Sequence, residues 1–234
     1  MLALERPATS DELYLARGDE VEPFRPVLTG DVFSEITIPG VGIEHALSMV
    51  ISHPCNMRTG DQLRERIQML PIVTYQEVPL NEWVNGSHAR VFLLPDSQLL
   101  EASCAARFDE TGMVESVELR QDRRRLCLSE RGILLLLQRL VYSQCRADIP
   151  IEHFDRAIAH VLAEAELLEE WNERLVPAHA GNDRAAALVD EATAFDALMK
   201  AQEAGMTLRE QLRDAHRRPN VRRLVRQEIE RRLG

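Results

Sequence analysis

Residues 44–60 of this chain are EHALSMVISHPCNMRTG, and the predicted fold is organised around them. The apolar run at residues 46–51 predicts a buried strand, because a short apolar segment bounded by polar residues fits a strand that is covered by its neighbours. The next segment, residues 52–60, gathers a histidine, a thiol, an amide, a guanidinium and two hydroxyl groups. We call this segment the exit loop. Loops held in place by buried strands often carry functional side chains, so we expect a site there.

The composition favours a globular protein of one large domain, or one domain with an appendage. The chain has 234 residues, of which 45% are hydrophobic, so it can fill a sizeable core. No apolar run approaches the ~20 residues that a membrane-spanning helix needs. The N-terminal segment is acidic and lacks the basic and apolar regions of a signal peptide. We therefore expect a cytoplasmic protein that does not associate with membranes.

The cysteines argue against a structural metal site. Cys55, Cys104, Cys127 and Cys145 are widely spaced and form no CxxC pair. In a cytoplasmic chain such residues are most simply free thiols. A zinc site built from His45, His53, His88 and Cys55 would match no known ligand spacing. We predict no metal and no cofactor.

Short apolar segments separated by turn signals predict antiparallel strands. The expected strands are residues 32–38, 47–52, 67–75, 89–94, 99–108, 113–119 and 125–128. Strands of this length with close turns are typical of a small barrel or sandwich. Pro71 lies inside one of them, and because proline cannot donate to a ladder it predicts an edge strand or a bulge there.

Helices are expected before and after the strands. Residues 10–17 predict a short helix, and Ser129 is a plausible N-cap for a helix that ends before Pro150. Its apolar run at residues 133–137 predicts deep burial. Later helices are expected at residues 151–175, 185–204, 208–217 and 221–233, with a linker at 176–183, Gly205 as a C′ residue and a capping box at Thr207 and Glu210.

Together these elements predict an α+β protein, a small antiparallel β-barrel followed by a helical C-terminal region. We expect four regions along the chain. They are an N-terminal arm at residues 1–25, a barrel with a packed helix at 26–147, a helical extension at 148–206, and an Arg-rich helical tail at 207–234.

The tail is the most distinct interaction feature of the sequence. It holds nine arginines against four acidic residues, whereas the whole chain has a net charge of −10. Two interpretations stay open. Arginines such as Arg222, Arg223 and Arg226 would contact nucleic acid or an acidic protein surface, or the tail would fold onto the acidic helix at residues 164–173.

The exit loop offers two kinds of chemistry. His53 and Cys55 would form a thiol nucleophile with its base, although sequence neighbours rarely form a catalytic pair and a packed strand-end turn explains both residues. Asn56, Arg58 and Thr59 would bind an anion, or serve as turn formers beside a solvated guanidinium.

A second basic cluster comes before the last expected strand. Arg123, Arg124 and Arg125 would contact phosphate groups, or lie on a solvated hairpin diluted by neighbouring acidic residues.

Three segments resemble PemK/MazF-type toxins. These are the opening GDVF at residues 30–33, LSMVIS at 47–52 and MLPIVT at 69–74, and the resemblance covers about residues 28–145. It implies an SH3-like barrel, ribosome-independent mRNA cleavage, a dimer and an antitoxin partner. It also implies a catalytic hydroxyl, which Thr74 matches, and a catalytic arginine in the loop before residue 47. That loop holds Glu44 and His45 and no arginine.

The leading hypothesis is a non-enzymatic interaction module of a bacterial cytosolic system. It would dock a protein partner or a second copy of the chain through the exit loop or the basic tail. A divergent PemK/MazF-like toxin or defence factor acting on RNA is the alternative, and a thiol enzyme that uses Cys55 is the second alternative.

Overall fold

The computed structural model describes residues 4–41, 47–59, 62–84, 86–179, 183–203 and 205–234. The chain divides into two compact units. The sheet unit consists of Met1–Pro23, Val27–Met57 and Leu63–Ala157, and the helical unit of Phe24–Pro26, Arg58–Gln62 and Ile158–Gly234. None of the described helices is long and apolar enough to cross a bilayer.

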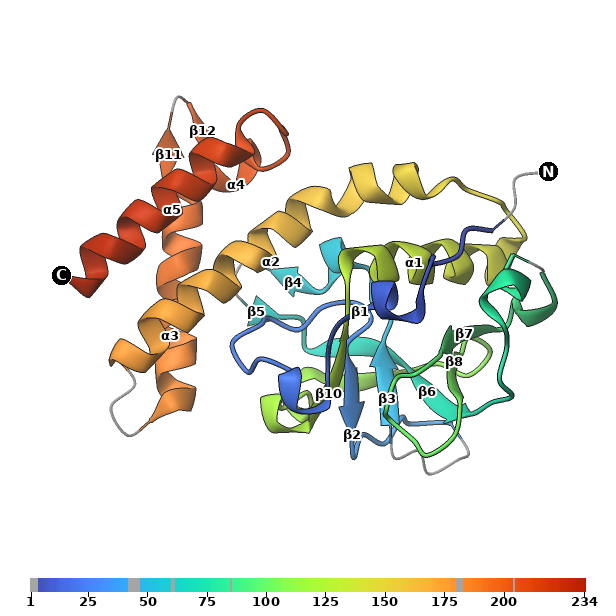
Figure 1. Ribbon diagram of the computed structural model, residues 1–234. Helices are drawn as coiled ribbons and strands as arrows, with labels where there is room; N and C mark the ends of the chain where they lie inside the picture. The colour runs from blue at the N-terminus through green and yellow to red at the C-terminus, as the bar shows by residue number, and fades with distance from the viewer. Residues whose placement is uncertain (1–3, 42–46, 60–61, 85, 180–182, 204) are drawn as a thin grey trace. The chain divides into compact units, whose positions relative to one another are not determined.

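The sheet unit is built on an antiparallel sheet that curls into a half-barrel (Figure 1). Along the sheet the strands are β1 (Tyr14–Arg17), β10 (Arg124–Leu128), β2 (Val32–Ser34), β3 (Leu47–Val50), β6 (Arg66–Thr74), β8 (Cys104–Arg107) and β7 (Val91–Leu94), while β9 (Gly112–Glu115) also pairs with β6. A separate short pair consists of β4 (Arg58–Thr59) and β5 (Gln62–Leu63), of which Arg58–Gln62 belongs to the helical unit. Together with the helices that follow, this sheet confirms the predicted α+β class.

The strand that leads into the exit loop, β3, is buried along its whole length and pairs with β2 and β6. Gly30 forms the turn that leads into β2. Its φ of +88° favours glycine, and a Cβ there would lie 2.5 Å from Cδ1 of Leu128. The backbone N–H of Gly30 donates to the carbonyl oxygen of Val50 at 2.8 Å, which joins this turn to the end of β3.

The helix predicted for residues 10–17 is wrong. Ser10–Leu13 forms a single 3₁₀ turn, and Tyr14–Arg17 is β1, which pairs with β10. Leu13 is fully buried and Tyr14 nearly so. Pairing with β10 gives the backbone of these residues hydrogen-bond partners that a short helix would otherwise provide. The tertiary contact therefore overrides the local preference for a helix.

Of the two settings predicted for Pro71, an edge strand or a bulge, the edge strand is wrong, because β6 has neighbours on both sides. Along one side, residues 66–69 pair with β9 and residues 72–74 pair with β8. Pro71 falls between these two stretches, where one partner strand ends and the next begins. The missing N–H therefore costs the sheet no ladder bond at that place.

The helix α1 (Glu130–Cys145) follows β10 directly, and Ser129 caps it as predicted by accepting from the Gly132 N–H at 3.0 Å. The apolar run Ile133–Leu137 is buried, also as predicted. Arg139 on the same helix is 2% exposed and donates to the Trp83 carbonyl oxygen at 2.7 Å. Burial lowers the pKa of Arg139 to about 10, which leaves it charged at neutral pH.

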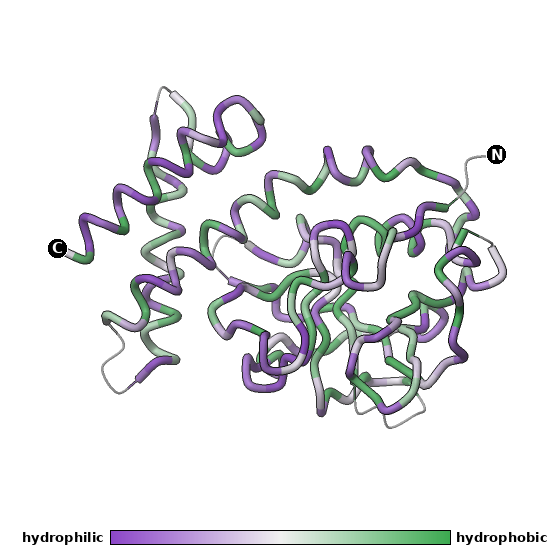
Figure 2. Tube along the Cα trace, viewed as in Figure 1, coloured by the Kyte–Doolittle hydropathy of each residue, from purple (hydrophilic) through white to green (hydrophobic). Residues whose placement is uncertain are grey.

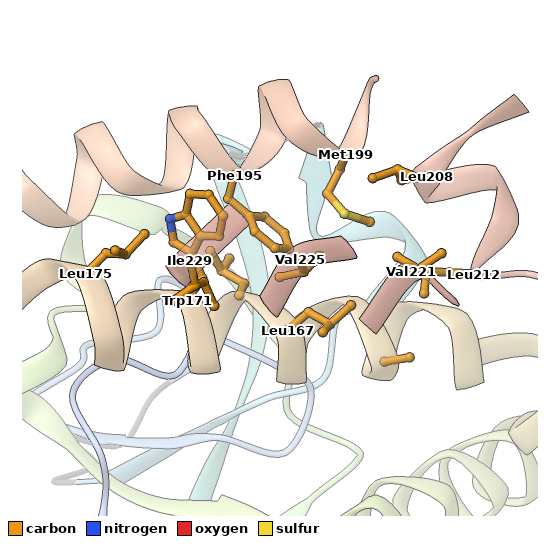
Figure 3. Close-up of a cluster of buried hydrophobic side chains, with 12 residues drawn as sticks. Leu167, Trp171, Leu175, Phe195, Met199, Leu208, Leu212, Val221, Val225 and Ile229 are labelled. Carbon is orange, nitrogen blue, oxygen red and sulfur yellow. The ribbon is translucent and has the colours of Figure 1, made fainter. Parts of the chain in front are cut away.

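The chain continues from the sheet unit into the helical unit through α2 (Ile151–His179). Then follow α3 (Arg184–Met199), β11 (Gln202–Glu203), β12 (Met206–Thr207), α4 (Leu208–Gln211) and α5 (Arg218–Leu233). The residues expected as a helical extension and as a separate tail share one core. Figure 3 shows Trp171, Phe195 and Ile229 converging in it from α2, α3 and α5.

Several helix boundaries differ from the prediction. α2 runs through Pro177 to His179, so residues 176–179 of the expected linker are helical, and residues 180–182 lie outside the described residues. α3 ends at Met199, and Gly205, with a φ of +79°, follows β11 and is not a helix C′ residue. The expected helix at 208–217 is only the four residues of α4, although its capping box of Thr207 and Glu210 is confirmed.

Candidate functional site

The exit loop folds into a short 3₁₀ turn, Pro54–Asn56. His53 caps this turn, because its Nδ1 accepts the backbone N–H of Cys55 at 3.3 Å. The thiol of Cys55 is exposed and donates to the Ala157 carbonyl oxygen at 3.9 Å. Burial lowers the pKa of His53. The ring nitrogen nearest the cysteine is therefore engaged with backbone and is not placed as a base for the thiol.

The other exit-loop residues do not gather around one point. Asn56 is exposed and Arg58 is half-buried. Thr59 belongs to β4, and its side chain lies outside the described residues. Arg58 belongs to the helical unit and Asn56 to the sheet unit. The structure thus gives no geometry for an anion site shared by these three residues.

The arginines in and just before the last strand make contacts within the sheet unit. Arg124 is fully buried, 3.6 Å from Asp31, and its guanidinium lies over the ring of Phe33. Arg123 contacts Glu35 and Glu118 at 3.6 and 3.5 Å, and Arg125 donates to the Ser34 hydroxyl at 3.0 Å.

Thr74, which the toxin resemblance marks as the hydroxyl position, lines a pocket at the end of β6. The pocket measures about 460 Å³. Thr74 and Tyr75 come from the end of β6, His88 and Arg90 from the segment before β7, and Arg146 from the end of α1. We call this the His88 pocket. Its lining residues are separated by up to 73 positions in the sequence, from Val73 to Arg146.

His88 and Tyr75 form the ordered wall of this pocket. The Tyr75 hydroxyl lies 3.2 Å from Nδ1 of His88. The two rings meet edge to face, with centroids 6.0 Å apart and an interplanar angle of 84°. His88 is buried, with 8% of its surface exposed, so its ring is held in one place. A polar group fixed in this way loses little conformational entropy when it binds a ligand.

Positive charge exceeds negative charge around the pocket. Arg90, Arg107 and Arg146 line it, against one carboxylate, Asp109. Arg107 is occupied, since it donates to both oxygens of Asp109 at 3.1 and 2.9 Å and lies 3.1 Å from Glu110. The hydrogen bond from Arg107 lowers the pKa of Asp109 and keeps it ionised.

Arg90 and Arg146 remain accessible. Both are exposed, and the described residues give neither a carboxylate within ion-pair distance. Arg146 ends α1 in the left-handed conformation, with a φ of 55°, and its guanidinium lies 5.4 Å from the ring centroid of Tyr142. The pocket therefore presents two guanidinium groups and a hydroxyl to solvent, beside the buried imidazole of His88.

Most of this pocket is not predictable from the sequence. His88 is predicted only as a possible metal ligand, and no sequence pattern singles out Arg90 or Arg146. One local signal is present, because an arginine just past a helix end interacts favourably with the last carbonyl groups. Nothing in the sequence places that helix end beside the end of β6.

Much of the tail pairs with acidic residues inside the helical unit. Arg222 lies 2.6 Å from Glu166 and Arg226 lies 2.8 Å from Glu170, which join α5 to α2. Arg223 instead donates to Gln227 and Asn220 on its own helix. For Arg222 and Arg226, folding onto the acidic helix is what the structure shows.

No family model matches this sequence, and no curated protein matches it either. Within the described ranges, no group of three or more His, Cys, Asp or Glu side chains is placed to hold a metal ion. The function is therefore argued from the His88 pocket and from the charges of the helical unit.

Proposed function

We propose that this protein is a cytoplasmic interaction module of a bacterial system, and that the His88 pocket captures an anionic group of a protein partner. The observation that carries the proposal is the convergence of Arg90 and Arg146 on a pocket whose wall is the ordered Tyr75–His88 pair. Guanidinium groups that are not held in a close ion pair are strong donors to phosphate and carboxylate oxygens.

The contacts favour this pocket over the two places that the sequence suggests. In the exit loop, His53 is bound to backbone, and in the tail, Arg222 and Arg226 are bound to glutamates. Capturing a partner there would first break these contacts. The His88 pocket needs no such rearrangement, because Arg90 and Arg146 face solvent.

Calorimetric titration of the intact protein tests the proposal. Inorganic phosphate, phosphoserine and acetate are the probes, at matched ionic strength. We expect saturable binding of at least one probe, and an at least tenfold weaker affinity in Arg90→Gln/Arg146→Gln. Binding should also weaken in His88→Ala, because His88 and the Tyr75 hydroxyl bonded to it line the same pocket.

The matched control is Arg6→Gln/Arg156→Gln, which removes the same charge from two exposed positions of the sheet unit away from the pocket lining. It should bind as the unmodified protein does. If no probe binds at millimolar concentrations, or if both double variants lose binding equally, the pocket has no role as an anion site.

A second candidate, a PemK/MazF-like defence factor acting on RNA, gains support from one observation. Thr74 shares its pocket with three arginines and His88, so basic side chains are present although the loop before β3 lacks an arginine. A phosphodiester would offer the anionic group, with Thr74 beside it. Cleavage of a labelled RNA that Thr74→Ala and His88→Ala abolish would favour this reading, whereas phosphate binding without cleavage favours the binding module.

The thiol-enzyme hypothesis receives the least support from the geometry. His53 uses Nδ1 on the Cys55 backbone, and the thiol itself contacts a carbonyl oxygen. Neither contact prepares a nucleophile.

A further inference from the structure

The arginines of the tail fall into two classes. Six of them lie within ion-pair distance of carboxylates of the helical unit: Arg209, Arg217, Arg222, Arg226, Arg231 and Arg232. For the other three, Arg213, Arg218 and Arg223, no carboxylate within the described ranges lies that close. These three lie within eleven consecutive residues, at the loop before α5 and along its first two turns. We call this region the α4–α5 corner.

Two features show that the corner is locally positive. Burial lowers the pKa of His160 in α2, and Arg213 and Arg218 lower it further, while Glu164 opposes the shift. In addition, the first turn of α5 holds no acidic residue and has no side-chain cap. The start of a helix carries a partial positive charge, so arginines there add to that charge and do not balance it. Figure 2 shows α5 as mostly hydrophilic, with hydrophobic positions at intervals along it.

We propose that the α4–α5 corner binds the phosphate backbone of double-helical DNA. This binding would be separate from that of the His88 pocket, because the corner lies wholly in the helical unit. Arg213 and Arg223 are exposed and Arg218 is half-buried. Guanidinium groups bind phosphate oxygens through two parallel hydrogen bonds, and each neutralised phosphate releases bound counterions.

The surroundings favour a duplex over other acidic partners. The aromatic residues of the helical unit are Phe24, Trp171 and Phe195, and none belongs to the corner, so it lacks the stacking platforms that single-stranded nucleic acids use. Protein interfaces need an apolar centre, and the exposed large hydrophobic residues of this unit, Val189 and Leu233, lie elsewhere in the sequence. B-form DNA is preferred to duplex RNA, since only its major groove admits a helix such as α5.

Fluorescence anisotropy with a labelled DNA duplex tests this inference on the full chain. Three phosphate contacts predict a slope of about −2.7 for log affinity against log salt, or about a 40-fold loss between 50 and 200 mM salt. We expect Arg213→Gln/Arg218→Gln/Arg223→Gln to bind at least tenfold more weakly at low salt and to lose most of that slope.

The control Arg6→Gln/Arg64→Gln/Arg156→Gln removes the same total charge from exposed positions of the sheet unit. It should keep the affinity and the slope. Equal losses in both triple variants would overturn the proposal, and so would absence of binding at 50 mM salt or tighter binding of a matched RNA duplex. Circular dichroism of both variants confirms that they fold. The result of this DNA-binding experiment does not change the result of phosphate titration at the His88 pocket. Either proposal can therefore be contradicted while the other stands.

Discussion

The Tyr14 hydroxyl donates to the Pro95 carbonyl oxygen at 2.6 Å and so joins the first strand of the sheet to the loop after β7. These strands lie at opposite ends of the sheet order, where no ladder bond connects them. Arg17 adds a second bond from β1 to the same loop, at 2.8 Å to the Asp96 carbonyl oxygen. The half-barrel is thus closed by side chains and not by a continuous sheet.

Replacing Tyr14 with Phe removes this bond and keeps the ring. Burial raises the pKa of the Tyr14 phenol, so the hydroxyl stays protonated and is a donor at neutral pH. We expect a loss of about 1 kcal/mol in the free energy of unfolding, the net value of a hydrogen bond of this kind. Urea denaturation measures it. Arg17→Gln, at a more exposed bond, should cost less, and an equal cost in both would argue against a closing role for Tyr14.

Gly30→Ala combines backbone strain with steric overlap. The added Cβ would meet Leu128 at 2.5 Å while the backbone keeps a φ of +88°. We expect a destabilisation of roughly 2–4 kcal/mol from the two effects together. Gly40→Ala is the matched control, because Gly40 has a φ of +81° and its added Cβ would meet nothing within 4 Å, so only the strain of about 1 kcal/mol applies. Similar melting temperatures for the two variants would contradict this account.

Glu191 holds three helices of the helical unit together. Its Oε2 accepts from Trp171 Nε1 at 2.9 Å and from Arg232 at 2.7 Å, and the guanidinium of Arg232 lies over the Trp171 ring. Glu191→Ala leaves a buried indole N–H without its acceptor, and we expect a loss of roughly 2–4 kcal/mol.

Arg174→Gln provides the comparison for Glu191, because its ion pair with Glu230 is largely exposed. An exposed pair contributes less than about 1 kcal/mol, so this variant should unfold at nearly the unmodified urea concentration. Tryptophan fluorescence follows both variants. A Glu191→Ala protein as stable as Arg174→Gln would mean that the buried contacts are replaced by solvent.

The helical unit should lose stability in acid through Asp196. Burial opposes ionisation of Asp196, but hydrogen bonds from Lys200 and Arg209 outweigh it and lower the pKa below the ordinary 3.8. A carboxyl group whose pKa is lower in the folded state stabilises the fold above its unfolded pKa, and this contribution disappears as the pH falls through the folded pKa. Unfolding by urea between pH 7 and pH 3 should therefore show a decline that is smaller in Asp196→Asn. The same slope in both proteins would contradict the assignment.

Structural features that depend on neighbouring residues can be predicted from the sequence of this protein. The Ser129 cap, the Thr207–Glu210 capping box and the buried run at residues 133–137 depend on neighbours within a few positions, and all three predictions are confirmed. The α+β order of short strands followed by helices is also predictable, because strand and helix periodicity are properties of consecutive residues.

Residues far apart in the sequence decide the rest. Tyr14–Arg17 is a strand because β10 lies beside it, and Pro71 is tolerated inside a central strand because two partner strands meet there. The tail arginines look alike in the sequence, yet only the packing of α5 against α2 neutralises Arg222 and Arg226 and leaves Arg213, Arg218 and Arg223 without such partners.

The residue types of the exit loop at residues 52–60 and the buried strand that leads into it were determined by the sequence alone. The His88 pocket was decided by the tertiary structure. Its parts come from the ends of β6 and α1 and from the segment before β7, and their side chains meet because the sheet curls and α1 packs on it. Composition and spacing do not predict that these side chains line one pocket, because this depends on distances that only the folded chain fixes.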